Sequence, residues 1–162
     1  MNLDEIAQTE GDHILIKGEW SKTMTTQNYN EIYTYFAKVL EPVAKDVKET
    51  TAYATTEAVS NAIWYGKGIV EIRYWFSDKL FKVSIKDQGD GFDVNDWKAW
   101  CNSVEIKRAA NEHGLDSVGQ YPGASSIRGG KSGLGLFLIH KFMDSVEFNE
   151  RGNEITLYKN FH

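Results

Sequence analysis

The residues best suited to chemistry begin at Glu57, on a segment whose apolar spacing predicts a helix. The text there reads EAVSNA, so Glu57 and Asn61 lie four positions apart and share one face of a helix. A carboxylate can take up a proton during a reaction, and a carboxamide oxygen can ligate a metal ion. Taken alone, the pair is equally typical of a solvated polar stripe.

A second candidate is the glycine-rich turn that begins at Asp87, directly after a predicted strand. The text reads DQGDG, with glycines at Gly89 and Gly91. Glycine allows a ligand to approach the backbone closely and allows positive φ angles. A carboxylate at the end of a strand stands where ligand contacts are common. The alternative is a plain turn, because Asp and Gly are frequent turn residues.

A third candidate is the run GGKSGLGL at residues 129–136, just before a predicted helix. The residues of interest in it are Lys131, Ser132, Gly133, Leu134 and Gly135. The amides and the positive end of a helix favour phosphate, and Lys131 adds a point charge. A P-loop is excluded, because its first glycine would fall at position 125, where the sequence has serine. A helix cap next to a flexible loop is the alternative.

Periodicity predicts the elements that position these segments. Helical spacing predicts helices over 26–41, 46–65, 95–110 and 134–143. Alternation predicts strands over 13–17, 70–77, 81–85, 146–148 and 154–158, with a hairpin turn at 77–79. Asp46 and Glu49 are spaced as a capping box for the second helix. This order of elements favours an α+β fold over a doubly wound parallel sheet.

Composition limits the class of protein. The chain has 162 residues, of which 41% are hydrophobic, and a net charge of −5, which disfavours a general nucleic-acid binder. Cys101 is the single cysteine, so a disulfide framework is excluded. The sequence has no apolar run long enough to span a membrane. We expect residues 1–12 to form a loose acidic tail and 13–162 a single cytoplasmic domain.

Together and in this order, the three segments resemble the GHKL (Bergerat-fold) ATPase superfamily of sensor histidine kinases, gyrase and mismatch-repair ATPases. The resemblance covers about residues 26–160. The small size and the text TEAVSNA are most similar to the bacterial anti-sigma-factor serine/threonine kinases, which phosphorylate a serine on an antagonist protein. The resemblance implies a two-layer α/β sandwich, with a mixed, mostly antiparallel sheet covered by helices on one face.

The resemblance also implies roles for single residues. Glu57 matches the general base that activates a serine hydroxyl or a water, and Asn61 matches the ligand of Mg²⁺. Asp87 matches the carboxylate that accepts a hydrogen bond from the adenine amino group. The implied ligands are therefore ATP and Mg²⁺.

The glycines match as well. Gly89 and Gly91 correspond to the glycines that shape the adenine pocket, and Gly133 and Gly135 to those whose amides face the phosphates. Lys131, followed by Ser132, stands where the serine kinases often have a phosphate-contacting arginine, and Leu134 lies between the two glycines.

The sequence departs from the serine kinases in its middle. The stretch between Gly91 and Gly133 is longer than expected, and we expect a lid at about residues 92–132. Trp97 and Trp100 lie in it at helical spacing, either as a partner surface or packed inward. Tyr65 stands where the relatives often have histidine.

These observations favour an ATP-binding regulator that transfers the γ-phosphoryl group to a serine or threonine of a partner protein. The expected partner is sigma-factor-like or resembles the antagonist of an anti-sigma factor, with no direct contact to nucleic acid or membrane. A homodimer is left open. The alternatives are a nucleotide-gated binding module without kinase activity and a stand-alone ATPase.

Overall fold

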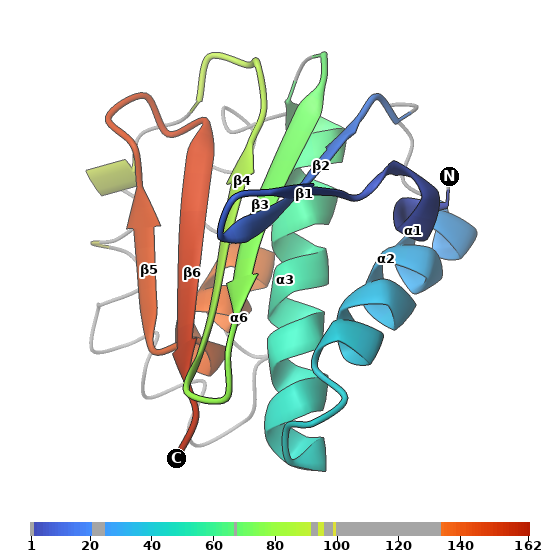
Figure 1. Cartoon of the computed structure of the whole chain (residues 1–162). Coiled ribbons are helices and arrows are strands. Elements are labelled where there is room, and N and C mark those ends of the chain that lie inside the picture. The colour runs from blue at the N-terminus through green and yellow to red at the C-terminus, as the bar shows by residue number, and fades with distance from the viewer. Residues whose placement is uncertain (1, 21–24, 67, 92–93, 96–98, 100–133) are drawn as a thin grey trace.

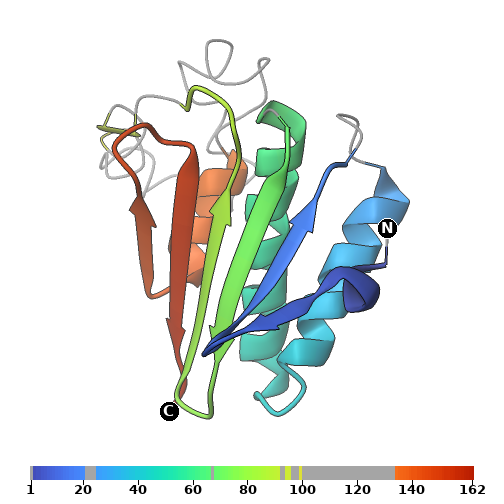
Figure 2. The ribbon, with the colours of Figure 1, turned by 45° about the horizontal axis from the view of Figure 1, so that its top comes forward.

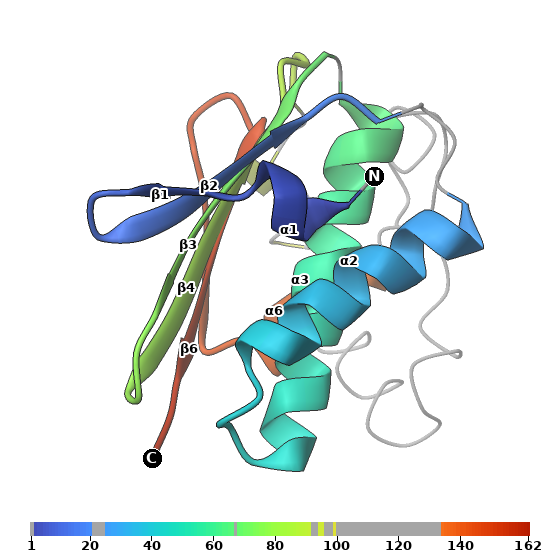
Figure 3. The same ribbon diagram turned by 45° about the vertical axis from the view of Figure 1, so that its right-hand side comes forward.

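A computed structural model of the chain describes residues 2–20, 25–66, 68–91, 94–95, 99 and 134–162. In these ranges a six-stranded sheet is covered on one face by helices (Figures 1 and 3). Apart from residues 94, 95 and 99, the expected helix at 95–110 and the expected lid at 92–132 lie outside the described residues. Trp97, Trp100, Lys131, Ser132 and Gly133 also lie outside them.

The sheet is antiparallel at every described strand pair. Its strands are β1 (Gln8–Glu10), β2 (His13–Gly18), β3 (Val70–Phe76), β4 (Leu80–Lys86), β5 (Ser145–Phe148) and β6 (Glu154–Asn160). They lie in the order β1-β2-β3-β4-β6-β5. The α+β sandwich is confirmed, with no parallel pair among the described strands.

The hairpin between β3 and β4 follows the sequence pattern closely. Phe76 pairs with Phe81 across it, and the Ser77 hydroxyl accepts hydrogen bonds from the Lys79 and Leu80 amides at 3.2 Å. In β3 the alternate residues Val70, Ile72 and Tyr74 turn inward, and Ile72 is fully buried. This alternation places one face of the sheet against the helices.

Within the described ranges, three helices form the second layer. They are α2 (Thr26–Val39), α3 (Lys45–Tyr65) and α6 (Leu134–Phe142), and α3 packs between α2 and α6. Figure 2 shows α3 and α6 behind the sheet. Phe36 of α2 and Phe81 of β4 are fully buried between the layers, with their ring centroids 6.2 Å apart. No helix among the described residues is both long and apolar enough to cross a bilayer.

The starts of the two long helices differ from each other. Thr25 caps α2, because its hydroxyl accepts a hydrogen bond from the Asn28 amide at 3.0 Å. At α3 the cap residue is Ala44, which makes no side-chain cap bond. The expected capping box at Asp46 is therefore wrong, since the helix begins earlier and Asp46 lies within its first turn. There its charge favours the positive end of the helix.

The first residues of the chain are ordered as well. Residues Leu3–Ile6 form a short helix, α1, and Gln8–Glu10 form the edge strand β1. Leu3 is 3% exposed and belongs to the core. The expected loose acidic tail is thus corrected: its few apolar residues are enough to dock it.

Candidate nucleotide site

Asp87 lies immediately after β4, at one end of the sheet. Its side chain is 2% exposed, and its Oδ1 accepts a hydrogen bond from the Gly89 amide at 2.7 Å. The Asp87 amide donates to the Asn153 carbonyl at 3.0 Å. A buried carboxylate is thus fixed by the backbone around it, as a ligand-binding acceptor must be.

Asn153, in the turn before β6, holds the Asp87 turn in place. It is 7% exposed, and its Nδ2 donates to the carbonyls of Asp87 and Gly89 at 3.2 and 3.3 Å. Asn149 orients it by accepting a hydrogen bond from the Asn153 amide at 3.0 Å. The sequence indicates a turn at residues 151–153, but nothing in it shows that this turn meets Asp87, 66 residues away.

Two glycines let other backbone segments approach this turn. Gly91 has a φ of +80°, and a Cβ on it would lie 1.6 Å from the Arg151 carbonyl oxygen. Gly66 follows α3 directly, and a Cβ there would lie 2.5 Å from the Asp87 Cβ. The end of α3 therefore touches Asp87, a contact that sequence reasoning missed.

Glu57 and Asn61 lie on the partly exposed face of α3, where α6 begins. Both are half-buried, and each is followed in the helix by a buried alanine, Ala58 or Ala62. A Cβ on Gly135 would lie 3.1 Å from the Glu57 Oε2 and 3.9 Å from the Asn61 Nδ2. The structure thus brings Glu57 and Asn61 close to Gly135, although these two segments are far apart in the sequence.

Tyrosines surround the other side of Glu57. The Tyr29 hydroxyl, from α2, donates to the Glu57 Oε1 at 2.9 Å. Burial, with the charge of Glu57, raises the pKa of Tyr29 well above its ordinary range. Burial and the same charge raise the pKa of Tyr53 to about 12. Both phenols therefore keep their protons at neutral pH. Neither was singled out from the sequence as a site residue.

The Asp87 turn and the residues around Glu57 are linked by α3. Glu57 and Gly66 are separated by about 2.5 helical turns, so this helix spans from the Glu57 group to the Asp87 turn. Gly89 is buried and Gly91 half-buried in that turn. Leu134 begins α6. Because α3 separates them, the Asp87 turn and the pair Glu57 and Asn61 can face opposite ends of one elongated ligand.

The residues present fit a magnesium nucleotide. A buried carboxylate such as Asp87 can accept a hydrogen bond from a base, and the missing side chain at Gly135 leaves space beside Glu57 and Asn61. Magnesium keeps several waters and needs one or two protein oxygens besides phosphate. Within the described ranges no three His, Cys, Asp or Glu side chains gather as metal ligands. The half-buried Asn61 carries a carboxamide oxygen of the kind that such a magnesium site can use.

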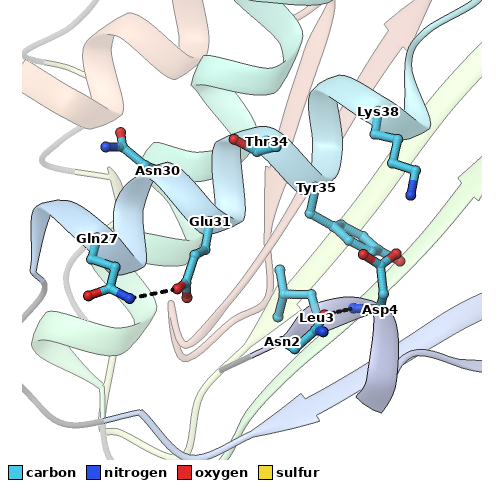
Figure 4. A pocket seen from close by; sticks show the side chains of 9 residues that line it. All are labelled: Asn2, Leu3, Asp4, Gln27, Asn30, Glu31, Thr34, Tyr35 and Lys38. Carbon is cyan, nitrogen blue, oxygen red and sulfur yellow. Dashed lines mark hydrogen bonds between the residues drawn. The ribbon is translucent and has the colours of Figure 1, made fainter.

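A separate groove of about 870 Å³ lies between α1 and α2 (Figure 4). It is lined by Asn2, Leu3, Asp4, Gln27, Asn30, Glu31, Thr34, Tyr35 and Lys38. These side chains are mostly polar, and none belongs to the three motifs. The groove is therefore distinct from the candidate nucleotide site.

The chain is distantly similar to several serine-protein kinases. It is 28% identical to the serine-protein kinase RsbW of Bacillus licheniformis, over 63% of this chain and 54% of the relative. It is 29% identical to RsbW of Halalkalibacterium halodurans, over 65% and 55%, and 28% identical to RsbW of Staphylococcus aureus, over 68% and 64%. The chain thus spans about half the length of the first two relatives.

The family match covers more of the chain than these relatives do. The histidine kinase-like ATPase domain matches residues 23–159, which include the Glu57, Asp87 and Gly135 segments. The antiparallel sheet under a helical layer agrees with this match. The chain therefore belongs to the histidine kinase-like ATPase domain family.

Proposed function

We propose that this domain binds Mg-ATP and transfers its γ-phosphoryl group to a serine or threonine of a partner protein. The observation that carries the proposal is the position of Glu57. One of its oxygens is held by Tyr29, and the other faces Gly135 at the start of α6. A base oriented in this way, beside a helix N-terminus, suits transfer from a phosphate to a hydroxyl.

Asp87 supplies the preference for adenine. Its carboxylate accepts a hydrogen bond from the amino group of adenine, whereas guanine has a carbonyl at the same position and would repel it. Because the carboxylate is 2% exposed, guanine would set one acceptor against another where water cannot intervene. We therefore expect a large difference between the affinities for adenine and guanine nucleotides.

At the other end, Asn61 would hold Mg²⁺ through its carboxamide oxygen. The ion supplies neutralisation of phosphate charge, which is the main requirement of phosphoryl transfer. The first turn of α6 presents its amides on the same side. The contribution of Lys131, Ser132 and Gly133 to phosphate binding remains a prediction from the sequence.

Glu57 then acts on the acceptor. The acceptor hydroxyl oxygen attacks the γ-phosphorus, and its proton passes to Glu57. The bond between the γ-phosphorus and the bridging oxygen breaks, and ADP leaves. The step needs Glu57 within about 2.6–3.2 Å of the hydroxyl, directly or through one water.

The relatives named above support a protein as the acceptor. We propose a sigma-factor-like partner, or a partner that resembles an anti-sigma antagonist, in the bacterial cytoplasm. Whether the domain pairs with itself is answered by light scattering of the purified chain.

Transfer of label from Mg-[γ-³²P]ATP tests this function. The purified chain is incubated with candidate acceptor proteins, and Glu57→Gln is compared with Glu49→Gln, an exposed glutamate on the same helix. We expect label on an acceptor with the wild type and Glu49→Gln, and at least a hundredfold less with Glu57→Gln. Release of inorganic phosphate alone would indicate a stand-alone ATPase. ATP-dependent partner binding without any transfer would indicate a binding module.

A further inference from the structure

Tyr29 joins α2 to the helix that carries Glu57. Its hydroxyl lies 2.9 Å from the Glu57 Oε1, across 28 residues of sequence. We propose that Tyr29 is a positioning residue for phosphoryl transfer, which holds the Glu57 carboxylate so that Oε2 faces the first turn of α6. This inference rests on the function proposed above, because it concerns the orientation of the same base.

A glutamate on a helix has three rotatable side-chain bonds, and a half-buried one is not held by packing alone. A hydrogen bond from a hydroxyl to a carboxylate is charge-assisted and therefore stronger than one between two neutral groups. It fixes Oε1 and leaves Oε2 toward Gly135, the side on which phosphates are expected. Losing this bond would spread the carboxylate over several orientations, of which one is productive.

Tyr29 is itself held in position by the start of α2. Its amide donates to the Thr25 carbonyl at 3.0 Å, in the first turn of the helix. The Thr25 hydroxyl caps the same turn through the Asn28 amide. The phenol ring is half-buried, so its hydroxyl meets Glu57 from a fixed position.

The protonation state of Tyr29 suits this role. Burial and the nearby charge of Glu57 raise its pKa above the ordinary range, so the phenol stays a donor at any pH at which the protein works. Burial and the charge of Glu57 also raise the pKa of Tyr53. We expect Tyr53 to supply part of the orientation when Tyr29 is changed, so the loss is partial.

The test compares two tyrosines of α2. Tyr29→Phe removes the hydroxyl on Glu57, and Tyr35→Phe removes the same atom where it is bonded to the Tyr74 hydroxyl at 2.8 Å, in the core. We expect Tyr29→Phe to lower kcat for γ-phosphoryl transfer about tenfold, with KM for Mg-ATP unchanged. Tyr35→Phe should lower the melting temperature and leave kcat within about twofold.

A second readout does not depend on activity. In protein labelled with ζ-¹³C tyrosine, the Tyr29 resonance should move in Glu57→Gln, and the Tyr35 resonance should not. An unmoved Tyr29 resonance would overturn the contact. Incorporation of label into Tyr29 itself would also overturn the proposal, because the hydroxyl would then be an acceptor.

The outcomes separate this inference from the proposed function. If Glu57→Gln abolishes transfer and Tyr29→Phe leaves kcat unchanged, the positioning role is wrong and the function stands. If Glu57→Gln transfers at the wild-type rate, Glu57 is not the base, and the positioning role of Tyr29 is wrong with it. If the wild type transfers no label to any acceptor, the proposed function itself is wrong.

Discussion

Asp87 and Glu57 lie in two parts of one candidate site and are held by different kinds of contact. Asp87 is buried, and hydrogen bonds from Gly89 and Asn153 fix its turn against the sheet. Glu57 is half-buried and is held by one side chain of a neighbouring helix. Under the proposed function, recognition of adenine would thus depend on backbone contacts at the end of the sheet, whereas orientation of the Glu57 carboxylate would depend on how the helices pack.

This difference makes the two parts sensitive to different changes. Substitutions near Asp87 should act on stability and nucleotide affinity together, because the same backbone contacts serve both. Substitutions near Glu57 should act on turnover with little effect on stability. The predictions below test this separation.

The largest effect is expected at Gly91. An alanine there would need a φ of +80° and would place its Cβ 1.6 Å from the Arg151 carbonyl oxygen. We expect Gly91→Ala to destabilise the fold by roughly 2–4 kcal/mol and to abolish ATP binding. Gly11→Ala is the control, because Gly11 has a φ of +64° in open space and should cost about 1–2 kcal/mol. Equal urea midpoints for both variants would contradict the close approach at Gly91.

Asn153 should come next. Asn153→Ala leaves the carbonyls of Asp87 and Gly89 without their side-chain donor, which we expect to cost about 2 kcal/mol. ATP affinity should fall with stability, because the Asp87 turn loses its support. Thermal unfolding and calorimetric titration measure the two effects, with Asn160→Ala, at the exposed far end of β6, as the control. A loss of stability with unchanged ATP affinity would separate Asn153 from the nucleotide site.

The tyrosine pair of the core predicts a dependence on pH. Burial, then the hydrogen bond between the Tyr35 and Tyr74 hydroxyls, raises the pKa of Tyr35 above its ordinary value of 10.0. The native state thus holds its proton more tightly than the unfolded chain does. The stability from this group is complete below about pH 10 and is lost as the pH rises further.

Tyr35→Phe should remove this dependence. At pH 7 the variant should be less stable by about 1 kcal/mol, and above about pH 10 its loss of stability with pH should be shallower than that of the wild type. Urea unfolding at several pH values measures both. Parallel curves for the two proteins would show that Tyr35 ionises as freely in the native state as in the unfolded chain.

The smallest effect on stability is expected at Gly135. Its Cβ would meet the Glu57 Oε2 at 3.1 Å, which requires a shift of a few tenths of an ångström. Alanine also favours a helix over glycine by up to about 1 kcal/mol. Gly135→Ala should therefore leave stability within about 1 kcal/mol of the wild type while lowering phosphoryl transfer. Unchanged transfer would mean that Glu57 does not act on this side.

Much of this fold follows from local patterns. The alternation at residues 70–77 and 81–85 predicts β3 and β4, and the spacing at 26–41 predicts α2, because burial on one face imposes these periods. Asp87 at the end of a strand follows from the same pattern. The start of α3 at Lys45 does not, because its cap residue, Ala44, makes no side-chain cap bond that a sequence pattern could reveal.

The supporting contacts of the site could not be predicted in this way. Asn153 meets Asp87, and Tyr29 meets Glu57, through hydrogen bonds between distant segments, and no period in the sequence records such pairs. The short helix α1 is missed for another reason, since four residues are too few to show a helical period. Its order depends on Leu3 reaching the core.

Thermal unfolding with Mg-ATP, with Mg-GTP and without nucleotide tests the central claim most directly, for the wild type, Asp87→Asn and the exposed control Asp90→Asn. A ligand at about 100 times its dissociation constant adds roughly 2.7 kcal/mol of stability. We predict that Mg-ATP, and not Mg-GTP, stabilises the wild type and Asp90→Asn, and that Asp87→Asn loses the shift. Equal shifts with both nucleotides, or an undiminished ATP shift in Asp87→Asn, would contradict an adenine site at Asp87.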